Sequence, residues 1–219
     1  GGAGGAGGAG GAGGAGGAVG ADGADGADGA ATFTGRECYP WAGGVARAEA
    51  GCAYAIQGNI LTGPEVVDAM EHAWSDSRGH TFAQRLITAL AAGDAAGGDS
   101  RGRQSAAVFA VEPGAGYDAC GVLADLRVDD HVDPVGELGR LLAEWELHFG
   151  RPEDVQPLEG ALADEVRTRL HRLGHTDEPV AAALGHWAGE SNYEARLSPD
   201  GIDRRVLEAL RAATPDITD

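Results

Sequence analysis

Two polar segments flank an apolar stretch, residues 105–128, and contain the residues best suited to chemistry. Asp129-Asp130-His131 follows that stretch, and a glycine-rich run with Asp99 and Arg101 precedes it. Carboxylates beside an imidazole can bind a divalent cation or act as acid and base. A glycine-rich loop can place backbone N–H groups and an arginine against an anionic ligand. The sequence therefore offers two candidate segments for binding or catalysis.

Each segment also has a purely structural interpretation. Asp133 stands directly before a helix pattern that opens with Pro134, so it can cap that helix while residues 129–131 form a solvated loop. The run at 97–105 can be a long crossover, and it lacks the lysine and the loop-to-helix order of a Walker phosphate loop. Because neighbours in sequence need not converge in space, spacing alone favours the capping interpretation and leaves the loop undecided.

Other candidate ligands and nucleophiles stand alone. His171 and His175 have the spacing of a helical zinc pair, but Gly174 ends that helix between them and no third ligand is near in sequence. Cys38 has no neighbouring base, and Ser105 lies inside a predicted strand instead of at a strand-to-helix turn. We therefore predict neither a metal nor a cofactor.

Composition argues against several classes of partner. The 219 residues include 34 acidic and 16 basic ones, and the net charge of −18 disfavours nucleic acid and anionic membrane surfaces. Three cysteines without a C-x-x-C pair indicate neither a disulfide framework nor a cysteine zinc site. No apolar run is long enough for a bilayer, and no signal peptide is visible. These features predict a cytoplasmic protein.

Hydrophobic periodicity predicts the elements that must position the two polar segments. Strands and helices both occur before residue 150, which indicates an α+β domain. The stretch 105–111 is apolar at every position after Ser105, so we expect it to be buried on both faces. The predicted strands are 31–34, 52–57, 105–111 and about 117–128. Three helices are predicted: one begins at Pro64, the second runs from Thr81 to Gly93 and opens with a capping box, and the third runs from Asp133 to Phe149.

The two ends of the chain follow other patterns. Residues 1–30 consist mainly of Gly-Gly-Ala and Ala-Asp-Gly repeats, whose side chains offer almost no burial against the backbone entropy of folding. We predict a disordered N-terminal tail there. After a linker at 151–158, residues 159–219 show only helical stripes, which predicts a small all-α helical module with its own core.

Four blocks between residues 31 and 150 are specific in combination, because they occur in a fixed order and spacing. They are Thr34-Gly35-x-x-Cys38-x-x-Trp41-Ala42-Gly43, Gln57-Gly58-Asn59-Ile60-Leu61-x-Gly63, Ala96-Gly97-Gly98-Asp99-x-Arg101-Gly102-x-Gln104-Ser105 and Leu126-Arg127-Val128-Asp129-Asp130-His131. On these blocks, residues 31–150 resemble the C-terminal half of a bacterial family of unknown function, domain of unknown function ten-twenty-eight. That family has an N-terminal-nucleophile (Ntn) hydrolase-like fold.

The resemblance implies a partial Ntn-hydrolase-like αββα sandwich. In the intact family parent it also implies hydrolysis of an amide or another C–N bond in a small-molecule or amide substrate. The residues that would line the substrate side here are Asn59, Asp99, Arg101, Asp129, Asp130 and His131. We expect Asp99, Arg101 and residues 129–131 to lie close together, at the ends of adjacent strands.

Three further blocks characterise the helical module. They are Leu170-x-x-Leu173-Gly174, Trp187-x-Gly189-Glu190-x-Asn192-Tyr193-Glu194 and Ile202-Asp203-x-x-Val206-Leu207. They resemble the peptidoglycan-binding-like module that often follows the Ntn-like domain. Thr176-Asp177-Glu178-Pro179 stands where authenticated wall-binding modules have a Gly-x-x-Asp-Gly turn. This departure argues against binding of a cell-wall glycan.

Ntn catalysis uses the side chain of the first residue as nucleophile and its free amine as base. Gly1 has no attacking group, and the family's first strands have no counterpart here, so we expect an inactive rear half of an Ntn-type hydrolase-like protein. The alternatives are a non-catalytic binding or assembly protein acting through the helical module, and a broken gene product. Uncovered apolar residues at Val108 and Phe109 would favour self-association into homo-oligomers.

Overall fold

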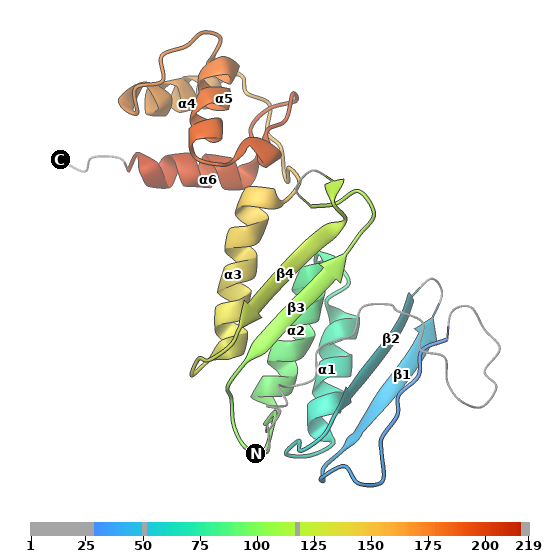
Figure 1. Cartoon of the computed structure of the whole chain (residues 1–219). Coiled ribbons are helices and arrows are strands. Elements are labelled where there is room, and N and C mark those ends of the chain that lie inside the picture. The colour runs from blue at the N-terminus through green and yellow to red at the C-terminus, as the bar shows by residue number, and fades with distance from the viewer. Residues whose placement is uncertain (1–28, 50–51, 117–118, 216–219) are drawn as a thin grey trace. The chain divides into compact units, whose positions relative to one another are not determined.

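The computed structural model describes residues 29–49, 52–116 and 119–215, so the predicted tail at 1–30 lies almost entirely outside the described residues. The described residues form a mixed α/β structure with six α-helices and two small antiparallel sheets of two strands each (Figure 1). The chain divides into two compact units, the first ending at Leu142 and the second beginning at Ala143. No helix in these described ranges has the length and apolar character needed to cross a membrane.

The first sheet pairs β1 (Gly43–Glu49) with β2 (Cys52–Gly58). The sequence predicts β2 but misses β1, because two glycines open it. A Cβ on Gly44 would meet the carbonyl oxygen of Ile56 at 2.5 Å, so glycine there permits the close approach of the two strands. The predicted strand at 31–34 is wrong. Those residues pair with no strand in the part of the chain that the structure describes, and Phe33 is 85 % exposed.

Helices α1 (Glu65–Asp76) and α2 (Phe82–Ala95) pack against each other. Both lie where the periodicity predicts them, and the stripe of α1 is buried. The capping box of α2 is also confirmed, since the Gln84 N–H donates to the Thr81 hydroxyl and the Thr81 N–H donates to the Gln84 side chain. These ends form from local sequence, which is why the sequence predicts them well.

The second sheet is the hairpin of β3 (Ala106–Val111) and β4 (Val122–Val128), and helix α3 (Pro134–Phe149) follows it. The hairpin itself is confirmed, although β4 begins at Val122 and not near residue 117. Burial of β3 on both faces is wrong. Its residues alternate between buried and exposed, and Phe109 is 58 % exposed.

The second unit contains α4 (Gly160–Arg172), α5 (Val180–Glu190), α6 (Arg204–Ala213) and the short 3-10 helix η2 (Glu194–Arg196). The three α-helices lie where the apolar stripes predict them. Their stripes meet in one core, whose most buried members are Val166, Leu170, Ile202, Val206 and Leu210. Burial of such side chains away from water is the main source of stability for a module this small.

Candidate functional site

The segments that contain Asn59 and Asp99 lie side by side in the first unit. Leu61 and Asp99 form an isolated antiparallel bridge, and the Ser100 N–H donates to the Ile60 carbonyl at 2.7 Å. These contacts join the end of the β2 segment to the loop before β3. The backbone at Asp99 and Arg101 is therefore held close to the segment that contains Asn59.

The second polar segment meets the same loop further along. The His131 N–H donates to the Gln104 carbonyl at 3.0 Å, just beyond the pair of Ala106 and Val128 in the hairpin register. Residues 129–131 thus lie at the end of the hairpin where β3 begins and β4 ends. The structure brings the backbones of the two predicted segments together, while their role in a site stays a prediction.

Local contacts of His131 agree with the interpretation that Asp133 caps helix α3 and that residues 129–131 form a solvated loop. Its Nδ1 accepts a hydrogen bond from the Asp133 N–H at 3.1 Å. Asp133 in turn accepts from the Gly136 N–H at 3.2 Å and so caps α3. His131 and Asp130 are both exposed.

Two carboxylates of this cluster, those of Asp99 and Asp129, each pair with an arginine. Asp99 accepts from Arg101 Nε at 2.9 Å and Nη2 at 2.6 Å, and these hydrogen bonds hold the pKa of Asp99 below its ordinary value. On the surface, Arg127 Nη2 lies 2.6 Å from Asp129 Oδ1. Because its pKa is lowered, the Asp99 carboxylate stays ionised at neutral pH, so it can orient a ligand but does not donate a proton. Within the described ranges, no group of three or more His, Cys, Asp or Glu could hold a metal ion.

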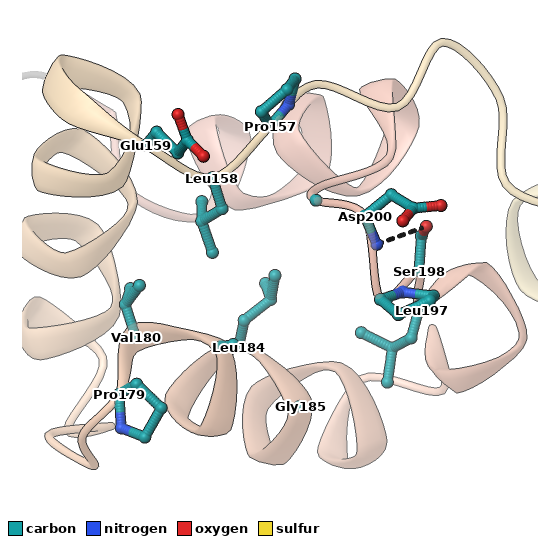
Figure 2. A pocket seen from close by; sticks show the side chains of 13 residues that line it. Pro157, Leu158, Glu159, Pro179, Val180, Leu184, Gly185, Leu197, Ser198 and Asp200 are labelled. Carbon is teal, nitrogen blue, oxygen red and sulfur yellow. Dashed lines mark hydrogen bonds between the residues drawn. The ribbon is translucent and has the colours of Figure 1, made fainter.

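A pocket of about 580 Å³ lies in the second unit, and sequence reasoning assigned no site there. Three separate segments build it: the approach to α4, the first half of α5 and the loop between η2 and α6 (Figure 2). Its apolar side chains are Leu158, Val180, Leu184 and Leu197, and its polar ones are Glu159, Ser198 and Asp200. The hollow is open, and polar and apolar groups share its surface about equally, so it can offer a ligand both kinds of contact. The sequence indicates this pocket only weakly. A proline lies in each of the three segments, but proline is also common in ordinary turns.

The loop that forms one wall of this pocket is held at its base by a buried ion pair. Arg196 precedes the loop and Asp203 follows it, and both side chains are fully buried with Nε and Oδ1 3.0 Å apart. Arg196 also donates to the Glu146 carbonyl at 2.6 Å, and Asp203 accepts from the Val206 N–H at 3.0 Å, which caps α6. The two ends of the loop are thereby fixed to the core of the module.

Backbone pairing fixes the position of the same loop against the approach to α4. The Gln156 and Ile202 N–H groups each donate to the other's carbonyl, at 3.0 and 2.9 Å. Within the loop, the Asp200 N–H donates to the Ser198 hydroxyl at 3.2 Å (Figure 2). The wall is therefore preorganised, which reduces the entropy that a ligand must overcome on binding.

Electrostatics in this unit support the folded arrangement. Burial alone would raise the pKa of Asp203, but hydrogen bonds from Arg196 and from the Glu153 and Val206 N–H groups outweigh it and lower that pKa. Hydrogen bonds from Arg211, partly offset by burial, and from Arg169 lower the pKa of Glu165 to about 2. Glu165 thus joins α4 to α6 through Arg211, while its pair with Arg169 lies within α4.

Fold and site together define a protein with a mixed α/β unit, which carries an exposed polar cluster, and a helical unit, which carries a pocket. The family model "Family of unknown function (DUF1028)" matches residues 17–138, and the chain belongs to this family, as the sequence blocks predicted. A second family model, "Putative peptidoglycan binding domain", matches residues 147–210, so a peptidoglycan-binding-like domain follows.

Comparison with solved structures finds the crystal structure of a protein from Silicibacter pomeroyi that carries the same DUF1028 family model. It is 29 % identical over 61 % of this chain and 49 % of that chain, with a TM-score of 0.43. The chain thus spans about half the length of that protein. No curated protein matches the sequence.

Proposed function

We propose that the chain is a binding protein whose helical unit takes the peptide part of peptidoglycan in the pocket between α4, α5 and the 197–201 loop. The preorganised pocket is the observation that carries this proposal. The match of residues 147–210 to a peptidoglycan-binding family model supports the ligand class. The mixed α/β unit would then be placed on its substrate by the helical unit.

Side-chain chemistry favours the peptide over the sugar. The lining combines aliphatic side chains with Glu159, Ser198 and Asp200 and includes no aromatic ring, so it offers apolar surface to methyl and alkyl groups but no flat π face for a sugar ring. The backbone of a peptide can hydrogen-bond to Ser198 and to loop groups at the rim. The segment Thr176–Pro179 stands where authenticated wall-binding modules have a Gly-x-x-Asp-Gly turn. Its last residue, Pro179, also lines the pocket, so this segment shapes the ligand site.

Isothermal titration calorimetry with a soluble disaccharide-peptide fragment, the peptide alone and the disaccharide alone tests this proposal. We expect the two ligands that contain peptide to bind with a dissociation constant on the order of 10–100 μM. Leu197→Glu should weaken binding at least about tenfold, because it places a charge in the apolar wall. Leu173→Glu is the matched control, since Leu173 is 36 % exposed against 38 % for Leu197 and does not line the pocket. Binding of the disaccharide alone, or equal losses in both variants, would contradict the proposal.

The polar cluster of the first unit favours a second function. We propose that Asn59, Asp99, Arg101 and residues 129–131 form the substrate side of an Ntn-type amide hydrolase, whose complete domain is an αββα sandwich. The backbone contacts that join these segments support this role. None of the six residues has a hydroxyl or a thiol, so they would bind and orient the amide while the nucleophile comes from elsewhere.

Nuclear magnetic resonance of the labelled chain tests the second function. On titration with N-acetyl amino-acid amides to about 10 mM, the backbone signals of Gly102, Gln104 and His131 should shift together, as expected for a weak ligand. Arg101→Met should abolish the shifts. Arg47→Met is the control, because Arg47 pairs with Glu71 on another part of the first unit. Signals that stay in place, or that move independently of one another, would sink the shared-site idea.

A further inference from the structure

The charged groups that line the pocket of the helical unit are all of one sign. Of its 13 lining residues, Glu159 and Asp200 are acidic and none is basic. Both carboxylates are exposed, and within the described part of the chain neither pairs with an arginine or a histidine. A hollow with two such carboxylates in its lining has a negative potential, which attracts cations and repels anions.

Leucine side chains form the interior of the same pocket. Leu158, Leu184 and Leu197 project into the hollow, while the carboxylates of Glu159 and Asp200 stand at its border (Figure 2). A ligand that suits both regions has an aliphatic chain with a positive charge at its end. An alkyl side chain with a terminal primary amine, as in lysine, has this form, because its methylene groups can be buried while the ammonium group stays at the surface.

Backbone hydrogen bonds fix the two segments that carry the carboxylates. The Glu159 N–H donates to the Pro157 carbonyl at 3.0 Å, and the Asp200 N–H donates to the Ser198 hydroxyl at 3.2 Å. The antiparallel bridge between the two segments joins them into one frame. The Glu159 side chain makes no capping hydrogen bond to α4, so its carboxylate is available to a ligand.

We propose that the pocket recognises a peptide by one residue whose alkyl side chain ends in a primary amine. The methylene groups lie on the leucines, and the ammonium group lies at the border of the hollow, where the charges of Glu159 and Asp200 attract it. A peptide that presents a carboxylate there is repelled by the same two charges. This inference rests on the proposed binding of a peptide in the pocket, and it names the side chain that the pocket selects.

Calorimetry with two peptides that differ only in one charge tests the inference. Both are stem-peptide fragments that contain a lysine, and in one of them the side-chain amine is acetylated. The free amine should bind roughly tenfold more tightly at low salt, because two carboxylates attract it. Sodium chloride at about 500 mM should remove most of that preference, since salt screens exposed charges. Equal affinity of the two peptides at low salt overturns the inference and leaves the proposed function in place.

Two charge-neutralising variants locate the effect. Glu159→Gln and Asp200→Asn should each weaken the free-amine peptide roughly threefold, and the double variant about tenfold, while the acetylated peptide binds as before. Glu194→Gln is the matched control, because Glu194 is an exposed carboxylate of the same unit that does not line the pocket. A double variant that binds the free amine like the wild type, or that loses both peptides equally, overturns the inference.

Amino-acid amides separate this inference from the choice of peptidoglycan as the ligand. In nuclear magnetic resonance of the labelled chain, Nα-acetyl-lysine amide at about 10 mM should shift the backbone signals of Gly185 and Gly201, as expected for a weak ligand. Nα-acetyl-norleucine amide has the same alkyl chain without the amine and should shift them less. If the lysine amide alone shifts these signals and no peptidoglycan fragment binds, the amine site stands and the proposed function fails. Equal shifts with both amides, or none with either, overturn the amine site.

Discussion

Arg196→Met should destabilise the helical unit by about 3–5 kcal/mol, the largest effect that we expect from a single substitution. It would leave the carboxylate of Asp203 buried without its cation, and both side chains are fully buried in the pair. Hydrogen exchange of peptides from 160–213 and urea denaturation of the full chain measure the loss. The exchange data assign it to the helical unit, and urea gives its size.

Two controls separate the ion pair from a general loss of packing. Arg167→Met removes a half-buried arginine that pairs with two exposed carboxylates, Asp164 and Glu178, and should cost less than about 1 kcal/mol. The double variant Arg196→Met/Asp203→Leu should recover most of the stability, because an apolar pair of similar volume avoids the desolvation of two charges. If Arg196→Met costs no more than Arg167→Met, the buried pair is not what holds the loop.

Acid should weaken the same unit in a defined range. Asp203 has a lowered folded-state pKa, so its contribution is present above its ordinary pKa of 3.8 and is lost as the pH falls through the folded value. Glu165 acts in the same direction between its ordinary pKa of 4.5 and about 2. The free energy of unfolding should therefore fall below about pH 4.5, and Glu165→Gln should flatten that fall.

Gly201→Ala should cost about 2–4 kcal/mol and distort the pocket wall. Gly201 has a φ of +152°, and a Cβ there would collide with the Gln156 carbonyl oxygen, the acceptor for the Ile202 N–H. The substitution should therefore break the pairing that fixes the loop. Urea denaturation gives the cost, and calorimetry with the disaccharide-peptide fragment should show weaker binding if the pocket is the ligand site.

Gly189→Ala is the matched glycine control. Nothing lies within 4 Å of a Cβ at this position, and Gly189 is in the last turn of α5. Alanine should leave the stability unchanged or raise it by up to about 1 kcal/mol, because it favours the helix. Equal stability of Gly201→Ala and Gly189→Ala would show that the loop tolerates a side chain and that its backbone is not the fixed wall we describe.

The helices could be predicted because their signals are local. The Thr81 capping box and the stripe Val66, Val67, Met70 and Trp74 each lie within a few turns of sequence. The strands were harder, because a strand depends on a partner elsewhere in the chain. For this reason strand β1 was not predicted. Its opening glycines are typical of a loop, and only the pairing with β2 shows that they belong to a strand.

For the polar cluster of the first unit, too, the sequence predicted one part and only the fold showed the other. Residue types and order were enough to point to Asp99, Arg101 and His131, and through the resemblance to the family. Only the fold shows that the Ser100–Ile60 and His131–Gln104 hydrogen bonds bring these segments together. The sequence also could not show that Asp99 and Asp129 each pair with an arginine.

By itself, the sequence determined the helices, the family and the net charge, since each depends on residues near one another or on composition. The tertiary structure decided the pocket, the buried pair of Arg196 and Asp203, and the exposure of Phe109. Each of these depends on segments that are distant in sequence or on what covers a surface. A pocket wall made by residues 157, 180 and 197 exists only after the helices have packed, because packing alone brings those positions to one place.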